Sequence, residues 1–433
     1  PAKITLANVY NHRSGLVQTR PPENRPLMKI LLLSKKFPFP LRDGESQAIH
    51  GLSKSLSELG ADVYLLAMNT KKHFFSGKKL PEEMAHYREV RTVNINTDIR
   101  LSDALRNLVK GTSYHLSRFD NQDYHHALTR WITEEDFDVV QLETLYLAPY
   151  LPTIRQHSNA LVAMRSHNVE HEIWERICSN VAFAPKRWYL QLLTQQLRSY
   201  ELARLNDYDL LLPITQRDER HFQRLGFQGR SLVIPIGLDT SCGEPDYDSY
   251  RKAPNLSFIG SLDWLPNLEG LHWFLDNVWP ELHRLHPQLQ FHIAGRNMPA
   301  SMLKMKRKNV IIHGEVPDAC AFVNQHSISL VPLLSGSGMR AKILEAMSLG
   351  RTVVTTSIGL EGIQATNGKD VLIADTPEEF IAVLSRCLNQ EFALEKIGRA
   401  AHTTFSRRYD RIRIADKLLR TYHRNLASKT IEV

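Results

Sequence analysis

The stretch MKILLLSKKFPFPLRDGESQAIHGLSKSLSELGADVYLLA, residues 28–67, sets the fold class of the chain. Short apolar runs at 29–33 and 62–67 predict two buried strands. Between them lies a predicted amphipathic helix, which Gly60 ends and whose apolar residues recur at helical spacing: Ile49, Leu52, Leu56 and Leu59. A strand, a helix and a strand in this order form a βαβ unit, which implies a parallel sheet with right-handed crossovers.

The same alternation continues along the chain. Further strands are expected at 90–95, 139–142, 161–164, 210–212 and 232–234, with helices at 101–116, 124–132 and 187–205. A segment rich in Gly, Pro, Asp and Ser then reads as a linker. A second series follows it, with strands at 256–259, 289–294, 310–313, 328–332, 352–355 and 371–374, and helices at 268–285, 340–349, 377–388 and 407–426.

This pattern predicts an α/β fold of two tandem Rossmann-like, doubly wound domains that face each other across a cleft. We expect an irregular N-terminal extension, a first domain, a linker, a second domain and a C-terminal helix, with bounds 1–27, 28–239, 240–254, 255–405 and 406–433. In such sheets ligands bind outside the carboxyl ends of the strands, so the cleft is the expected binding site.

Composition narrows the function classes. The chain has 433 residues, of which 42% are hydrophobic and 23% charged, and this excludes a disordered or fibrous protein. The net charge of +8 suits a nucleotide diphosphate, an anionic membrane or a nucleic acid. Nucleic acid is not an expected partner, because no stacking-aromatic strand motif or helix-turn-helix pattern is present.

Cysteine spacing and hydropathy predict a cytoplasmic protein. Four cysteines lie far apart and form no C-x-x-C pair, so they are expected to be reduced thiols: Cys178, Cys242, Cys320 and Cys387. No apolar run approaches the about 20 residues that span a bilayer, and the first residues hold no signal-peptide core.

The segment LLSGSGMRAKILEAM, residues 333–347, carries the strongest functional signal. It follows a predicted strand and opens a helix, and its glycines let a backbone approach a ligand closely. A helix start offers free N–H groups to phosphate. Arg340 and Lys342 place two cations at that end, which is unfavourable without an anion. Glu345 lies on the same face as Lys342, where a carboxylate can accept hydrogen bonds from a ribose. Solvated charges on a surface helix are the alternative interpretation.

The run GMRAKILEAM at 338–347 resembles the donor motif of retaining GT-B glycosyltransferases, which use nucleotide sugars. Three further segments are similar to the donor domain of a bacterial exopolysaccharide branch of that group: GSLDWLPN at 260–267, GEVPD at 314–318 and GLEG at 359–362. In the first half, RSHNVE at 165–170 also matches that branch. The likeness extends over residues 28–426 and is strongest at 256–374.

This resemblance implies a metal-independent, hexosyltransferase-like enzyme of cell-surface polysaccharide or glycan synthesis that acts with retention. The nucleoside diphosphate sugar would be a co-substrate, with no further cofactor and no bound metal. The acceptor would be a saccharide or a lipid-linked saccharide. In GT-B enzymes a C-terminal helix commonly crosses back to the first domain, and the same is expected of 406–433 here.

The resemblance also implies roles for single residues. Arg340 and Lys342 would hold the diphosphate and stabilise its departure, and His167 would act beside the reacting sugar. Glu345 would bind the ribose, in a donor site completed by Gly260, Gly336, Ser337, Gly338 and Met339. Asp43 and Gly44 would form a loop on the acceptor side, facing the diphosphate.

Two departures from the family pattern bear on activity. The family commonly has two glutamates seven residues apart, and Ser337 stands where the first is expected. Asp263 and Trp264 stand where an Arg and a Lys usually follow the first strand of the donor domain. Arg340 and Lys342 are expected to replace those cations. A degenerate protein that binds a nucleotide sugar without transferring it is therefore an alternative.

Other motifs give competing hypotheses. His167, Glu170 and His171 fit H-x-x-E-H, an inverted zinc-protease motif, with Glu172 or Glu175 as a third ligand. However, His167 directly follows a predicted strand and is expected in a loop, whereas that chemistry needs both histidines on one helix face. Two D-Y-D segments, at 207–209 and 246–248, resemble a metal-binding D-x-D motif, but we interpret both as turns.

A mixture of cations and aromatic residues suggests contact with a membrane. The segment KKHFF at 71–75, with Lys78 and Lys79 after it, suits an anionic membrane face, and Arg187, Trp188 and Tyr189 could join it. A solvated loop is the alternative. The corresponding location is cytoplasmic, peripheral at the inner face of the cell membrane.

Overall fold

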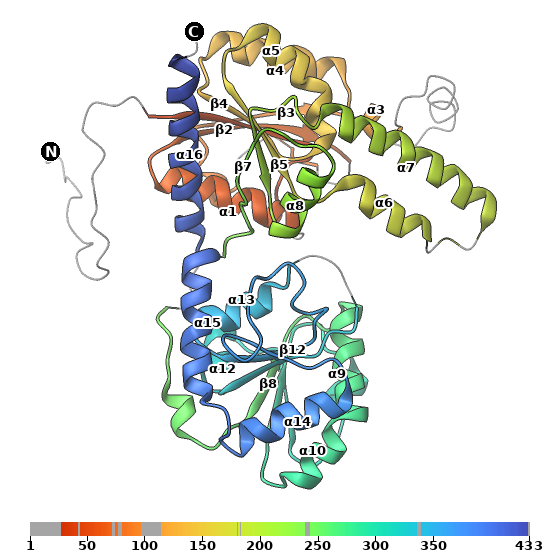
Figure 1. The fold of residues 1–433 in the computed structure, drawn as a ribbon, viewed down its shortest axis with the longest axis vertical. Helices are drawn as coiled ribbons and strands as arrows, with labels where there is room; N and C mark the ends of the chain where they lie inside the picture. The colour runs from red at the N-terminus through yellow and green to blue at the C-terminus, as the bar shows by residue number, and fades with distance from the viewer. Residues whose placement is uncertain are drawn as a thin grey trace, which may run out of the picture.

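A computed structural model describes residues 27–41, 44–71, 74–76, 80–96, 114–179, 181, 183–238, 243–335 and 339–431. It contains two α/β bodies arranged along the long axis of the molecule (Figure 1). The first domain holds a seven-stranded sheet and the second a six-stranded sheet. All strand pairs in both sheets are parallel, as the βαβ pattern predicts.

The first sheet has the order β3-β2-β1-β4-β5-β6-β7. Its strands are β1 (Lys29–Ser34), β2 (Asp62–Asn69), β3 (Glu89–Asn94), β4 (Val139–Leu142), β5 (Leu161–Ser166), β6 (Leu210–Pro213) and β7 (Arg230–Ser231). The helices of this domain are α1 (Gly44–Glu58), α3 (Tyr114–Ser117), α4 (Gln122–Glu134), α5 (Leu151–His157), α6 (Glu170–Ser179), α7 (Ala184–Arg204) and α8 (Gln216–Arg224), with 3₁₀ turns at Glu82–Met84 and Leu145–Tyr150.

The second sheet has the order β10-β9-β8-β11-β12-β13. Its strands are β8 (Leu256–Ile259), β9 (Phe291–Ala294), β10 (Val310–Gly314), β11 (Ile328–Val331), β12 (Thr352–Thr355) and β13 (Leu372–Ile373). The helices of this domain are α9 (Leu265–Asn277), α10 (Trp279–Leu285), α11 (Ala300–Leu303), α12 (Ala319–Asn324), α13 (Ala341–Ser348), α14 (Pro377–Leu388) and α15 (Leu394–Arg408), with a 3₁₀ turn at Asp248–Arg251 before β8.

Helices cover both faces of the first sheet. Leu31 and Leu33 of β1 pack into one core, which includes side chains from α4, α5, α7 and α8. Ile30 and Leu32 point the other way, into a core shared with α1 and with α16 (Arg411–Ile431). Because successive residues of a strand face opposite sides, a continuous apolar run is what a strand buried on both faces requires.

The C-terminal helix α16 belongs to the core of the first domain, although α15 before it packs on the second. Figure 1 shows α15 beside the second sheet and α16 running along the first. Ala415, Leu418 and Tyr422 of α16 are fully buried among side chains of the first sheet. Arg411 donates hydrogen bonds to Ser55 and Glu58 of α1 at 3.0 Å and 2.5 Å. The chain therefore crosses between the domains twice.

The predicted helix at 407–426 is wrong in one respect, because the chain breaks between α15 and α16. At the break, Leu238 N–H donates to Tyr409 O at 3.0 Å and Arg411 N–H donates to Leu238 O at 3.4 Å. A Cβ on Gly237 would lie 2.7 Å from Arg411 Cα, so only glycine permits this approach. The two crossing segments are thus bonded to each other where the domains meet.

Two other element predictions are wrong at their bounds. The segment 232–234 is not a strand. Leu232 and Ile234 donate hydrogen bonds to Leu211 O and Pro213 O, but Pro213 has no N–H and so cannot donate to the opposite segment, as a strand ladder requires. The predicted helix at 268–285 is two helices, because Pro280 at the start of α10 cannot continue α9.

The prediction of four reduced thiols is also wrong. Cys320 is disulfide-bonded, whereas Cys178 and Cys387 are free and buried. Pairing of cysteines depends on which segments fold side by side, and the spacing along the chain does not report that. Within the described ranges, no helix combines the length and apolar character that a bilayer span requires.

Candidate active site

A cleft of about 750 Å³ lies between the two domains. In the second sheet, β8 has β9 on one side and β11 on the other, and this change of direction opens a crevice at the carboxyl ends of the strands. Segments that follow β8, β9 and β10, together with α13, form one wall, and α1 with the chain at 236–238 forms the other. Polar and charged side chains in the lining are Gln47, His50, Lys54, Ser261, Asn267, Arg296, Glu315, Lys342, Glu345 and Arg411.

Lys342 projects from the first turn of α13 into this crevice. Its ammonium group donates to the amide oxygen of Asn267, which α9 holds almost fully buried. The same ammonium lies 4.9 Å from the ring centre of Phe258 and 6.0 Å from that of Trp264. Side chains from β8, α9 and the turn between them therefore fix the position of this cation.

Gly260 makes room for that cation. A Cβ at this position would lie 2.9 Å from Lys342 Nζ and 2.9 Å from Asn267 Nδ2. Real Cβ atoms do not approach other atoms so closely, so any other residue would displace the lysine or the asparagine. Gly260 and Lys342 are therefore neighbours, and both line the cleft.

The ammonium group of Lys342 is poorly solvated. Burial lowers its pKa from the ordinary value of 10.5 to about 7. The charge of Glu345 opposes this shift, and that of Arg340 adds to it. An anion that enters the cleft stabilises a cation held in this way, because it replaces the favourable interactions with solvent that the buried ammonium has lost.

Glu345 lies one turn after Lys342 on α13 and also lines the cleft. Partial desolvation raises the pKa of its carboxyl group, and the charge of Lys342 opposes the change. The two side chains thus share one face of the helix, as their spacing predicts.

Arg340 lies at the N-cap of α13, with its side chain 4% exposed. Burial lowers the pKa of its guanidinium group, while the carboxylate of Glu361 acts in the opposite direction. Arg340 does not line the cleft itself. Met339 beside it is half-buried and packs on the core beneath α13. Gly336, Ser337 and Gly338 lie outside the described residues.

On the first-domain side, helix α1 supplies the cleft wall. Gln47, His50 and Lys54 recur on one face of that helix and line the cleft. Gly44 is the first residue of α1 and is not part of the lining, and Asp43 lies outside the described residues. Leu41, in the segment before α1, also lines the cleft, but the polar side chains on this wall come from the helix after it.

His167 is buried next to an ionic cluster at the end of β5. Its Nε2 lies 3.1 Å from Glu143 Oε2, and the same carboxylate oxygen lies 3.4 Å from Arg165 Nη1. Burial by itself raises the pKa of Glu143, but the charge of Arg165 and the contacts with His167 outweigh it and lower the pKa. His167 is 7% exposed and does not line the cleft as it stands.

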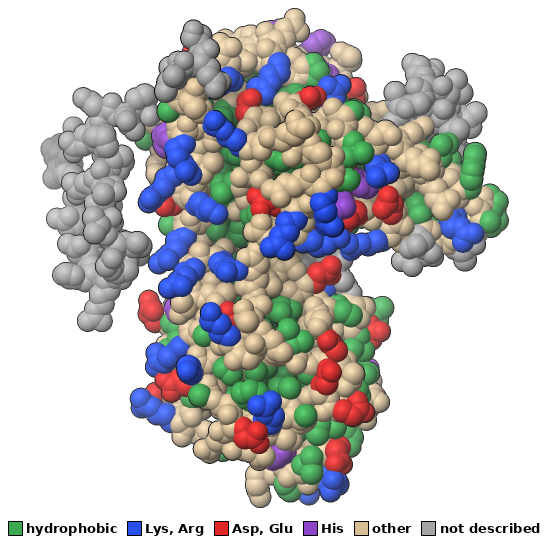
Figure 2. All heavy atoms as spheres, in the orientation of Figure 1, with side chains coloured by type: hydrophobic (Ala, Val, Ile, Leu, Met, Phe, Trp, Pro, Cys, Tyr) green, Lys and Arg blue, Asp and Glu red, His purple; other side chains and the backbone are tan. Residues whose placement is uncertain are grey.

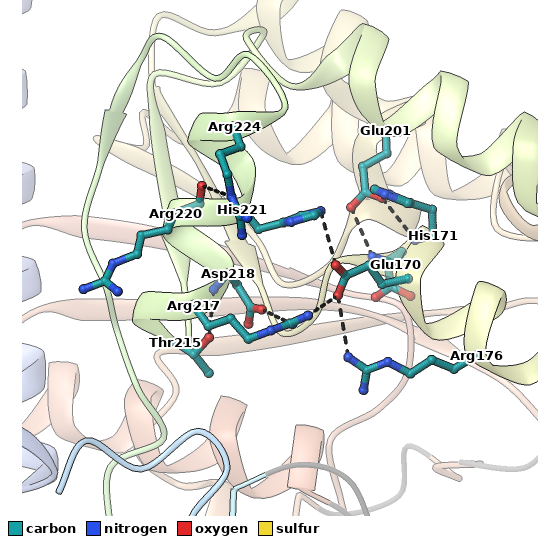
Figure 3. A network of polar contacts seen from close by, with 11 residues as sticks. Glu170, His171, Arg176, Glu201, Thr215, Arg217, Asp218, Arg220, His221 and Arg224 are labelled. Carbon is teal, nitrogen blue, oxygen red and sulfur yellow. Dashed lines mark hydrogen bonds and ion pairs between the residues drawn. The ribbon is translucent and has the colours of Figure 1, made fainter. Parts of the chain in front are cut away.

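The geometry does not support the zinc-hydrolase alternative. His167 contacts Glu143, whereas His171 contacts Glu201 at 2.6 Å (Figure 3). Glu172 is bonded to Arg217 at 2.8 Å instead of facing the histidines. Within the described part of the chain, no group of three His, Cys, Asp or Glu side chains is arranged to hold a metal ion.

The two D-Y-D segments have structural contacts. Asp209 accepts from Arg155 and from the backbone N–H of Val162, and so it ties β5 to the chain before β6. Asp246 accepts from the backbone N–H of Asp248, which is the contact of an Asx turn. Both agree with the interpretation as turn residues.

The fold is that of the GT-B glycosyltransferases. The chain is similar to sucrose-phosphate synthase from Thermosynechococcus elongatus, with 16% identity, 93% of this chain and 100% of that chain covered, and a TM-score of 0.61. It is also similar to Anabaena Alr3699/HepE in complex with UDP, with 16% identity, 91% and 99% covered, and a TM-score of 0.59.

Residues 253–390 match the model of the family Glycosyl transferases group 1. A curated relative is the "Uncharacterized 44.6 kDa protein in cps region" of Klebsiella pneumoniae. It is 24% identical over 407 residues, which are 89% of this chain and 97% of the relative.

The sequence motif did not reveal all residues of the cleft. Asn267 was part of a matching segment, but its role as the partner of Lys342 depends on how α9 packs against β8 and α13. His50, Lys54 and Arg411 carry no motif. Their only signal is their position on the cleft-facing sides of α1 and α16, which periodicity alone does not identify.

Proposed function

We propose that the chain transfers a hexosyl-type unit from a nucleoside diphosphate sugar to a hydroxyl group of a saccharide or lipid-linked saccharide. The observation that carries the proposal is the desolvated Lys342 ammonium, held by Asn267 against Gly260 at the carboxyl end of β8. Anabaena HepE, which shares the fold, has been crystallised with UDP and with UDP-glucose. The Klebsiella relative in a cps region favours a role in polysaccharide synthesis.

In the proposed reaction, protein cations replace a divalent metal ion. The bond between the anomeric carbon and the diphosphate breaks, and its electron pair stays on the phosphate oxygen. The acceptor oxygen forms the new bond to the anomeric carbon with retention, and its proton neutralises part of the diphosphate charge. Lys342, Arg340 and the N–H groups at the start of α13 stabilise the departing diphosphate.

The donor would lie along the second-domain wall. Glu345 is proposed to accept hydrogen bonds from the ribose, one helical turn from the diphosphate at Lys342. The apolar lining formed by Val316, Ala319 and Val323 then suits the base. We further propose that the loop at 336–339 contacts the donor sugar and that Asp43, Gly44 and His167 act on the acceptor side.

A lipid-linked acceptor would require contact with a membrane. The hairpin of α6 and α7 projects from the first domain (Figure 1). Phe183 and Trp188 on it are 67% and 65% exposed, next to Arg187. Phe74, in the basic segment singled out above, is 67% exposed. We propose that these side chains contact the membrane face, as aromatic residues and cations do at interfaces. Residues 72–73 and 77–79 lie outside the described residues.

A panel of nucleotide sugars tests the function. The correct donor should raise the melting temperature, because it binds the folded state. In the Glu345→Ala variant we expect this shift to be lost at the same concentration, since the ribose contact is removed. Donor hydrolysis by the parent, and its loss in the variant, would identify an enzyme. A melting shift with neither hydrolysis nor transfer would identify the non-catalytic binder that Ser337 suggests. No shift with any donor would refute the proposal.

The pKa of Lys342 predicts a pH dependence. With a pKa of about 7, the free enzyme loses the ammonium charge as the pH rises through neutrality. We therefore expect kcat/KM for the donor to fall above about pH 7. Bound diphosphate raises the pKa, so the fall in kcat should lie at higher pH. Lys342→Arg should abolish the alkaline fall in kcat/KM, because arginine stays charged. An unchanged fall in that variant would contradict the assignment.

A further inference from the structure

A second cavity, of about 250 Å³, lies where the two domains meet and shares no lining residue with the cleft. The first domain contributes Thr215 and Gln216 at the start of α8 and three residues of α16. The second domain contributes Gly362, Gln364 and the end of α15. A ligand bound here would contact both domains at once. We call it the junction pocket.

The charged side chains that line the junction pocket are all cations: Arg407, Arg408, Arg413 and Lys417. Nearby acids do not compensate them. Asp410 accepts from a backbone N–H of α16, and Asp416 pairs with Arg420. Within the described residues, Arg407, Arg413 and Lys417 form no ion pair. Figure 2 shows Lys and Arg side chains gathered across the waist of the molecule on this face.

The meeting of these cations in one cavity is costly. Helix α16 begins at Arg411, and Asp410 caps that end by accepting from the backbone N–H of Arg413, while the side chains of Arg413 and, one turn later, Lys417 add two positive charges to the cavity. Arg407 and Arg408 come from the last turn of α15, where cations are favourable. The break between the helices brings both pairs into one cavity. Repulsion within the cavity would decrease if an anion entered it.

We propose that the junction pocket binds a phosphate-bearing ligand and that its occupancy stabilises one relative orientation of the two domains. The proposal rests on the cavity and its charges and does not depend on the sugar-transfer reaction. The phosphate can belong to a free metabolite or to a lipid headgroup, since both present the same multiply charged oxygens to arginine and lysine. Arginine guanidinium groups suit such oxygens because they can bind two of them at once.

Isothermal titration with inorganic pyrophosphate at low ionic strength tests the site. The donor cleft is first silenced by Arg340→Ala with Lys342→Ala, which leaves the junction pocket intact. In that background we expect one pyrophosphate to bind. Adding Arg407→Gln, Arg413→Gln and Lys417→Gln should weaken its binding at least about 10-fold, because three charge-assisted contacts are lost.

The matched control removes three cations from the same helix outside the pocket: Arg420→Gln, Arg424→Gln and Lys429→Gln. Equal weakening by both triple variants would overturn the proposal, because it would show an effect of net charge only. The absence of any pyrophosphate site in the silenced background would overturn the proposal for a free ligand.

A second experiment measures binding to vesicles with and without phosphatidic acid. If only the pocket variant loses binding to the acidic vesicles, the ligand is a lipid phosphate. If the pocket variant keeps both pyrophosphate binding and vesicle binding, the site is refuted.

Discussion

Replacing Arg340 and Lys342 together by alanine should lower the rate of sugar transfer by about 10³-fold or more. Loss of one preorganised group that stabilises transition-state charge typically costs about 10²- to 10³-fold, and the proposed function assigns both cations to the same developing diphosphate charge. Both lie at the start of α13, and their charges influence each other. Single-turnover measurement of transfer from the donor identified by thermal shift provides the readout.

The control for this double variant removes two exposed cations from the same domain, Lys369→Ala with Lys396→Ala. We expect a rate within a factor of about 2 of the parent, since exposed charges far from the diphosphate are screened. Because Arg340 is buried, unfolding by urea should be measured on both variants to separate loss of catalysis from loss of structure. A folded double variant with a normal rate would refute the roles assigned to these residues.

Replacing Glu143 by alanine should destabilise the protein by about 3–5 kcal/mol, because it leaves the charge of Arg165 buried without its partner. Glu143 and Arg165 are 0% and 1% exposed. The carboxylate also holds His167 and accepts from Gln141 at 2.5 Å, while Gln141 in turn accepts from Tyr422 of α16. The change therefore disturbs a buried polar chain that links β4, β5 and the C-terminal helix. The midpoint of urea unfolding measures the effect.

Two further variants distinguish a buried charge from a general loss of contacts. Glu58→Ala removes an exposed partner of Arg411 and should cost less than about 1 kcal/mol. The pair Glu143→Leu with Arg165→Met removes both buried charges and should recover much of the stability lost in Glu143→Ala. If Glu143→Ala were no less stable than Glu58→Ala, the buried ion pair would have no structural role.

Much of the fold could be predicted because its determinants are local. The apolar runs of β1, β2 and β4 and the helical spacing in α1 specify strands and helices regardless of what packs on them. Errors occurred where a distant segment intervened. Leu238 breaks the C-terminal helix by bonding to residues 409 and 411, and Pro213 prevents a full strand at 232–234.

The residues of the candidate site likewise fall into those that the local sequence predicts and those that only the packing of distant segments brings together. Arg340, Lys342 and Glu345 lie within a few residues of one another in the sequence, so a helix start that carries two cations could be predicted at α13. The fit of the Lys342 ammonium against Gly260 and Asn267 could not, because these residues are up to 82 positions apart and meet only through the packing of β8, α9 and α13.

By itself, the sequence determined two parallel sheets and a cationic helix start that suits a diphosphate, since periodicity, glycine and charge act over a few residues. Tertiary structure decided which side chains of α1 and α16 reach the cleft, which cysteine is oxidised, and that the cations of α15 and α16 meet in one pocket. These outcomes depend on burial and on distances between segments far apart along the chain, and such distances are fixed only when the domains pack.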